Sequence, residues 1–476
     1  MSDSSSSKYK RLISNTAMIA VGSFGSKILK YLLVRFYTEL LSADQYGLAE
    51  NISETAILLI PIISFSIADA VHRFLMDKSY SPKDVFSSGV TAWLMGSLIL
   101  AVVTPILSSI DYFHDHVWLI VLYISASIFH SLCSQFAISL NKFGLGAVAG
   151  ISNTLTMLLC NILFLLPLNM GVTGYVLSVI VADVVAALIL IFALKLWKYV
   201  DFTAVQKETL KKMLRFSIPL IPTAVFWWII NVSDKFMVTA YISEAANGIY
   251  SAAYKIPSLI MFVSGIFLAA WKNSAISEFG NEETGKFYSN VFKTSSGMYF
   301  MVSSVLIAGT PILVRLLFSD EYQSAWVYVP ILTAAMVFYN CSSFFGSIYT
   351  VVKKSTYSLY TSLAGAILNV ALNYFLLTTY KDAYGAAVAT LVCYIAVFVI
   401  RAISVRKFID FDTAPFITTL NSVLIIGQVA VVTIRPKFWF IYGILFALVI
   451  IALNVKPFII LALNILKKLK NRRNAV

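Results

Sequence analysis

Three basic residues lie in or at the end of a hydrophobic segment, residues 12–33, that is long enough to cross a bilayer. They are Lys27, Lys30 and Arg35. About 20 helical residues span the roughly 30 Å hydrocarbon core, and a lysine near its centre costs roughly 3 kcal/mol on insertion scales. Lys27 and Lys30 are three positions apart and therefore share one helix face. We expect these charges to face a partner or a polar cavity.

Further charges interrupt three other apolar segments, at about 48–74, 214–241 and 247–275. They are Glu50, Glu54, Asp69, Asp234, Lys235 and Lys255. Lysine is a mobile cation suited to phosphate, and a buried carboxylate can bind a coupling ion or pair with a lysine. An alternative is that pairs such as Lys27 with Glu54, or Lys235 with Glu50, only hold helices together. Arg35, Glu50 and Lys235 could also extend to the outer interface.

The composition predicts an all-α integral membrane protein. Apolar residues make up 59% of the 476 positions, charged residues 12%, and the mean hydropathy is +0.83. Such a chain has too little polar surface for a soluble globule. Segments of spanning length predict about fourteen helices, at residues 12–34, 48–74, 86–109, 117–140, 145–168, 172–196, 214–241, 247–275, 289–313, 326–351, 357–379, 384–405, 413–434 and 438–463.

Basic residues concentrate in alternate loops, which predicts the orientation. The loops assigned to the outside hold only Arg315, Lys381, Arg435 and Lys437. The positive-inside rule therefore places both termini in the cytoplasm. Arg401 is grouped with Arg406 in a cytoplasmic segment. The net charge of +13 then reflects topology and contact with anionic membrane lipids, and no nucleic acid partner is expected.

The chain repeats itself after about 200 residues. Ser42 recurs as Ser243, Asn161 as Asn373, Gly174 as Gly385, and residues 199–202 as 408–411. Because a unit of six helices is even, both copies enter the membrane in the same direction, as in many secondary transporters. The predicted domains are a six-helix bundle (1–198), an amphipathic cytoplasmic linker (199–213), a second six-helix bundle (214–409), and two additional helices with a basic tail (410–476). A solvated linker without lipid contact is the alternative for the second part.

Two sets of motifs resemble those of a known family. Near the start of the chain they are Asn15-Thr16, Ser26-Lys27, Tyr37-Thr38, Tyr46-Gly47 and Asp69-Ala70-Val71. The closer likeness is in Arg215 to Pro222, Trp227-Trp228, Ser233-Asp234-Lys235, Ala246 to Tyr250, Lys255-Ile256-Pro257 and Ala270-Trp271. These motifs resemble the polysaccharide flippases of the Wzx type, in the multidrug, oligosaccharidyl-lipid and polysaccharide exporter (MOP) superfamily. The resemblance implies two six-helix bundles around a cavity. It also implies movement of an undecaprenyl-diphosphate-linked oligosaccharide to the outer leaflet of a bacterial cytoplasmic membrane.

With this resemblance, the charges divide into two groups of candidate site residues. The cavity cations for substrate are Lys27, Lys30, Arg35, Lys235 and Lys255, and the ion-coupling or charge-pairing groups are Glu50, Glu54, Asp69 and Asp234. We expect no catalytic residue, metal or cofactor beyond a coupling ion, H⁺ or Na⁺. Pro61, Pro219, Pro222 and Pro257 are expected to interrupt helices.

Three functions follow from these features. The first is an ATP-independent flippase working by alternating access, with other polysaccharide-assembly proteins as further partners. The second is an ion-coupled drug or metabolite antiporter of the same superfamily. The third is a membrane polymerase or ligase, which the lack of a large predicted outer loop argues against. The first reading predicts that the protein is not an enzyme.

Overall fold

The computed structural model describes residues 33–76, 80–109, 111–203, 205–280, 283–352 and 354–459, so Lys27 and Lys30 lie outside the described residues. Within these ranges the chain is helical, without strands. In the part of the chain that the structure describes, eleven helices are long and apolar enough to cross a membrane, and α17 (Trp439–Asn454) is a shorter apolar helix. The prediction of an all-α, multi-pass membrane protein is confirmed.

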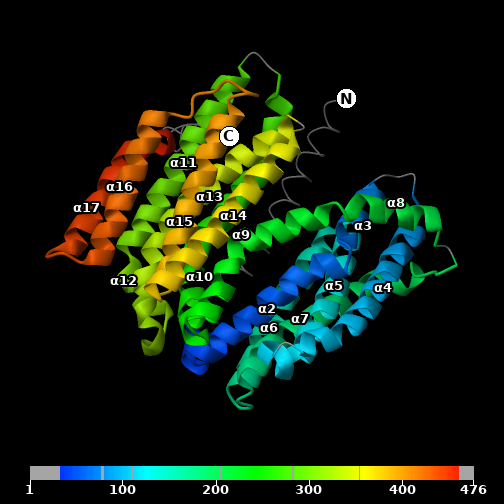
Figure 1. Cartoon of the computed structure of the whole chain (residues 1–476). Helices are drawn as coiled ribbons and strands as arrows, with labels where there is room; N and C mark the ends of the chain where they lie inside the picture. The colour runs from blue at the N-terminus through cyan, green and yellow to red at the C-terminus, as the bar shows by residue number, and fades with distance from the viewer. Residues whose placement is uncertain are drawn as a thin grey trace, which may run out of the picture. The chain divides into compact units, whose positions relative to one another are not determined.

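The chain forms two compact units, Met1–Val232 and Ser233–Val476, whose boundary falls within α9 (Leu220–Tyr241). The other labelled helices of the first unit are α2 (Ala43–Ile63), α3 (Ile67–Met76), α4 (Pro82–Ser108), α5 (Val117–Ser139), α6 (Phe143–Leu165), α7 (Gly171–Leu194) and α8 (Lys207–Ser217) (Figure 1). Those of the second unit are α10 (Glu244–Glu278), α11 (Thr284–Ala308), α12 (Thr310–Leu317), α13 (Tyr328–Val351), α14 (Ser355–Tyr380), α15 (Tyr384–Val405), α16 (Pro415–Ile434) and α17 (Figure 1). The four-part domain division stays a prediction.

The predicted second helix is in fact two helices. α2 ends at Ile63 and α3 begins at Ile67, with Phe65 and Ser66 at φ of 54° and 49° between them. Pro61 lies inside α2, and its carbonyl accepts a hydrogen bond from Ser66 N at 3.0 Å. The break therefore comes a few residues after the proline.

The other prolines differ in their effect. Pro219 lies between α8 and α9, where it fits a helix boundary, because proline cannot donate a backbone hydrogen bond. Pro222 is near the start of α9, and α10 runs through Pro257 as one helix of 35 residues. The expectation that Pro257 interrupts its helix is wrong, because α10 continues through this proline.

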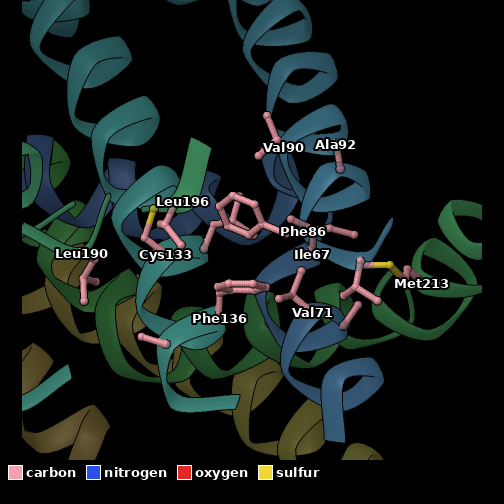
Figure 2. Close-up of a cluster of buried hydrophobic side chains, with 14 of the residues drawn as sticks. Ile67, Val71, Phe86, Val90, Ala92, Cys133, Phe136, Leu190, Leu196 and Met213 are labelled. Atoms are coloured by element: carbon pink, nitrogen blue, oxygen red, sulfur yellow. The ribbon is translucent and has the colours of Figure 1, made fainter. Parts of the chain in front are cut away.

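A cluster of buried hydrophobic side chains joins several helices of the first unit, as Figure 2 shows. Phe86 of α4 packs on Phe136 of α5, with ring centroids 4.4 Å apart. Ile67 and Val71 of α3 and Met213 of α8 also belong to the cluster. Fully burying an apolar side chain of this size stabilises by about 1.5–3 kcal/mol, so α8 is anchored through its apolar side.

Polar contacts fix α8 further. Asp84 in the first turn of α4 accepts hydrogen bonds from Gln206 N at 3.0 Å and from Thr209 Oγ1 at 2.6 Å, at the N-terminus of α8. The carboxylate thus satisfies donors that a helix start leaves unpaired and interacts favourably with the helix dipole. The basic residues Lys207, Lys211 and Lys212 remain exposed on the other side.

The internal repeat is visible in equivalent hydrogen bonds. Ser42 caps α2 by accepting from Gln45 N at 3.3 Å, and Ser243 caps α10 by accepting from Ala246 N at 3.1 Å. A serine side chain at this position satisfies a free N–H of the first turn. The repeat therefore places the same start signal on corresponding helices.

A second pair of contacts corrects the predicted register of the repeat. Ser87 of α4 accepts a hydrogen bond from Asp201 N, and Ser289 of α11 accepts one from Asp412 N, each at 2.8 Å. Asp201 and Asp412 each also accept from the backbone N two residues later. Asp201 therefore corresponds to Asp412 and not to Asp410, as the sequence alignment of these segments had suggested.

Candidate functional site

The most completely built polar centre of the second unit surrounds Asp234. This carboxylate lies in the middle of α9 with 1% of its surface exposed. Tyr250 Oη of α10 donates to Oδ2 at 2.6 Å, Thr390 Oγ1 of α15 donates at 3.3 Å, and Lys235 N donates to Oδ1 at 3.0 Å. A buried carboxylate is costly unless hydrogen-bonded, so these donors from three helices explain how it is tolerated.

Two asparagines of α14 extend this centre. Ser233, next to Asp234, donates to Asn369 Oδ1 at 3.2 Å, and Asn373 Nδ2 donates to the same oxygen at 3.1 Å. Both asparagines are buried, and Asn373 Oδ1 and Asn369 Nδ2 have no hydrogen-bond partner among the described residues. A buried amide oxygen without a donor is an available ligand for a cation.

The donor set fits a hard monovalent or divalent cation better than a transition metal. Carboxylate, amide and hydroxyl oxygens are the ligands of hard cations. Within the described residues no group of three or more His, Cys, Asp or Glu side chains could hold a metal ion. The residues present would therefore supply one charge and neutral oxygens to an ion such as Na⁺.

Glu50 occupies a second buried acidic position, in the first unit. Its side chain is 4% exposed, and Tyr175 Oη of α7 donates to Oε1 at 2.9 Å. Tyr37 lies against Tyr175, with centroids 4.8 Å apart, and accepts a hydrogen bond from Asn161 Nδ2 at 2.9 Å. The carboxylate thus lies beside a group of aromatic hydroxyls.

The remaining predicted site residues have varied surroundings. Glu54 is half-buried, and its backbone carbonyl accepts a hydrogen bond from Trp228 Nε1 at 2.9 Å. Arg35 forms an ion pair with Glu39 at 2.6 Å, with the two side chains 41% and 50% exposed. Asp69 is exposed in the first turn of α3. Lys235 is buried and Lys255 half-buried.

The structure adds buried charges that the sequence had not singled out. Arg401, counted as a loop residue, lies inside α15 with 2% exposure. It donates to Thr361 Oγ1, Ser342 O and Ser362 Oγ at 3.0, 2.9 and 2.8 Å. Arg401 lies four residues before the end of α15, and hydropathy does not distinguish a buried arginine at such a position from one in the flanking loop. For this reason it was counted with the cytoplasmic basic residues.

Tyr250 and Thr390 were not predicted as partners of Asp234, and Asn369 was not predicted as the partner of the neighbouring Ser233. They lie on three different helices, so their sequence spacing gives no indication of contact. Asn373 offered a signal, since it repeats Asn161. Both asparagines donate Nδ2 to the carbonyl four residues earlier, at 2.8 and 3.0 Å.

The helical architecture and the buried polar centres define a multi-pass membrane protein with the fold of MOP-superfamily transporters. A family model described as "Polysaccharide biosynthesis protein" matches residues 12–272, more than half of the chain, and the chain belongs to that family. No curated protein sequence gives a significant match.

Solved structures share the fold at low sequence identity. Lipid II flippase MurJ, in an inward closed conformation, is 17% identical with a TM-score of 0.66, covering 93% of this chain and 100% of its own. An inward-facing multidrug resistance MATE family transporter is 14% identical with a TM-score of 0.66, covering 80% and 94%. A MOP superfamily transporter from Pyrococcus furiosus is 13% identical with a TM-score of 0.59, covering 83% and 94%.

Proposed function

We propose that this protein is a flippase that moves an undecaprenyl-diphosphate-linked oligosaccharide from the cytoplasmic to the outer leaflet for surface polysaccharide synthesis. The observation that carries the proposal is the extent of the family match. Residues 12–272 include every charged residue predicted for the site, from Lys27 to Lys255. The family relation and the intramembrane charges thus coincide in the same helices.

The charges suit such a cargo. Lysines Lys27, Lys30, Lys235 and Lys255 would attract the diphosphate, with Arg35 at the outer end of the first span. Several weak contacts serve a transporter better than one tight clamp, because the cargo must leave again. Anionic lipids and other polysaccharide-assembly proteins are the expected partners.

Transport would proceed by alternating access without ATP and without enzymatic chemistry. Asp234 is the candidate ion-coupling residue of the second unit, since its oxygen-rich surroundings suit Na⁺. The acids Glu50, Glu54 and Asp69 are proposed as further coupling or pairing groups. The protein would lie in a bacterial cytoplasmic membrane with both termini in the cytoplasm.

Reconstitution tests this proposal. The full chain in liposomes receives a fluorescent undecaprenyl-diphosphate oligosaccharide, and transfer between leaflets is scored with Na⁺ gradients, pH gradients and voltage. We expect Lys30→Ala and Lys255→Ala to lose transfer at unchanged protein level. Lys286→Ala is the matched control, because Lys286 is 74% exposed beside Glu283 and should transport normally.

Absence of transfer by the native chain under every gradient would contradict a flippase. The ion-coupled drug or metabolite antiporter would then become the leading function, since the MATE transporters share this fold. Normal transfer by both lysine variants would instead refute the cationic path. Asp234→Asn, measured with and without Na⁺, should remove the dependence on that ion if it couples transport.

A further inference from the structure

A separate polar centre lies in the first unit, where α5, α6 and α7 meet. Asp183 Oδ1 lies 2.9 Å from His130 Nδ1 and accepts a hydrogen bond from Asn153 Nδ2 at 2.9 Å. Asp183 Oδ2 accepts a hydrogen bond from Ser127 Oγ. We name these four residues the His130–Asp183 centre. The function proposed above uses none of them.

The hydrogen bonds define how the four side chains face one another. Asn153 Nδ2 and Ser127 Oγ donate to the two oxygens of Asp183, so each carboxyl oxygen accepts a hydrogen bond. One proton lies between His130 Nδ1 and Asp183 Oδ1. The second ring nitrogen, Nε2, is left to bind or release a proton.

The centre lies near the middle of the predicted membrane spans. His130 is 13 residues from Val117 at the start of α5, and Asp183 is 12 residues from Gly171 at the start of α7. At about 1.5 Å per residue both are roughly 18–20 Å along their helices. A charge at that depth is expensive, and proton binding to Nε2 changes the net charge of the pair from −1 to zero.

The surrounding titratable groups are mostly acidic. α2 contributes Glu50 and Glu54, and Tyr123 of α5 lies within electrostatic range of both and of Asp183. α3 contributes His72, whose Nδ1 is hydrogen-bonded to Ser139, the last residue of α5. α4 contributes Asp84, which accepts a hydrogen bond from Thr209 of α8. α6 contributes Cys160. Among the described residues, His130 is the basic partner of Asp183.

We propose that His130 and Asp183 form a proton-binding site through which a proton gradient acts on the first unit. The two side chains are 21% and 13% exposed, so α5, α6 and α7 enclose most of the pair. The inference rests on the proposed transport function for its coupling part. It assigns the proton to the first unit, distinct from the Na⁺ candidate at Asp234 in the second.

Histidine NMR tests proton binding without any transport assay. The chain has four histidines, so selective ¹⁵N labelling of the full protein in nanodiscs gives few ring signals, and His130→Gln assigns the one of interest. We expect His130 to carry its proton on Nδ1 at alkaline pH and protons on both nitrogens at acid pH. In Asp183→Leu, the alkaline form should lose its Nδ1–H preference. A single ring proton on native His130 from pH 5 to pH 9 would overturn the proposal.

Transport then tests the coupling. An imposed pH gradient should stimulate oligosaccharide transfer by the native chain, and the stimulation ratio should fall to about one in His130→Gln, while transfer without a gradient continues. His114→Gln is the matched control, because His114 lies in the short 3₁₀ helix Asp111–His116, outside the α-helices, and its Nδ1 is 2.8 Å from Ser108 O. Should His130→Gln not reach the membrane, Asp183→Asn provides the same comparison.

The outcomes separate the two proposals. Full gradient stimulation in both His130→Gln and Asp183→Asn refutes coupling through this centre. If the native chain moves no oligosaccharide at all, the proposed function fails, and the NMR titration by itself decides whether His130 and Asp183 bind a proton.

Discussion

Gly96 is the position where one added methyl group should disturb the first unit most directly. A Cβ built on Gly96 of α4 would lie 2.0 Å from the carbonyl oxygen of Ile63, the last residue of α2. The obstacle is backbone, so no rotamer change can remove it. The two helices would have to separate by more than about 1 Å, at the joint where α2 gives way to α3.

The expected magnitude follows from two opposed effects. Overpacking a well-packed site costs about 1–3 kcal/mol, whereas replacing a helical glycine by alanine gains up to about 1 kcal/mol. Because the clash is with backbone, we expect the upper end of the cost and a net loss of about 2 kcal/mol for Gly96→Ala. Gly150→Ala in α6 is the control, since nothing lies within 4 Å of its added Cβ.

Thermal unfolding of both variants in the same detergent measures the difference. Gly96→Ala should unfold at a lower temperature than the native chain, and Gly150→Ala at the same or a higher temperature. An unchanged or raised unfolding temperature for Gly96→Ala would show that α2 and α4 do not approach as closely as described. It would also show that Gly96 does not pack closely against Ile63 at the end of α2.

Two further predictions concern the segments before α8 and before α16. Asp84→Ala should make residues 205–217 exchange their amide hydrogens faster, because α8 loses the carboxylate at its N-terminus, a change worth about 0.5–2 kcal/mol for comparable caps. The control is Glu208→Ala, which removes only an exposed pair with Lys212 and should leave the exchange unchanged. Equal exchange in both variants would contradict the anchoring role of Asp84. The hydrogen bond from Lys293 lowers the pKa of Asp412 below its usual value of 3.8. The pair therefore stabilises the 409–414 loop at neutral pH, and this contribution is lost as the pH falls through the lowered pKa. A ¹³C NMR titration of the Asp412 carboxyl should show that Lys293→Met raises this pKa, and identical titrations of the native and variant chains would refute the ion pair.

Much of the fold was predictable because a bilayer imposes simple constraints. The predicted helix at 145–168 is α6 at Phe143–Leu165, and that at 384–405 is α15 at Tyr384–Val405. Spanning length and apolar composition suffice there, since every backbone polar group must be satisfied within the segment. The break at Ser64–Ser66 was missed, because the hydropathy of residues 48–74 continues across it.

The candidate site was predictable by residue type and less so by partner. An acid or base in an apolar helix is conspicuous in a sequence, which is why Glu50 and Asp234 were selected and are buried. Their roles in binding stay predictions. Arg401 and Asp183 are also buried, at 2% and 9% exposure, but Arg401 was counted with the cytoplasmic basic residues and Asp183 was not considered.

The sequence by itself determined the membrane class, the approximate spans, the repeat and the family resemblance, because these depend on composition and on residues close together in the chain. The tertiary structure decided which polar groups meet. Asp234 is joined to Thr390 across 156 positions, and Asp183 to His130 across 53. Buried charges in an apolar medium require hydrogen-bond partners, and helix packing alone brings those partners within reach.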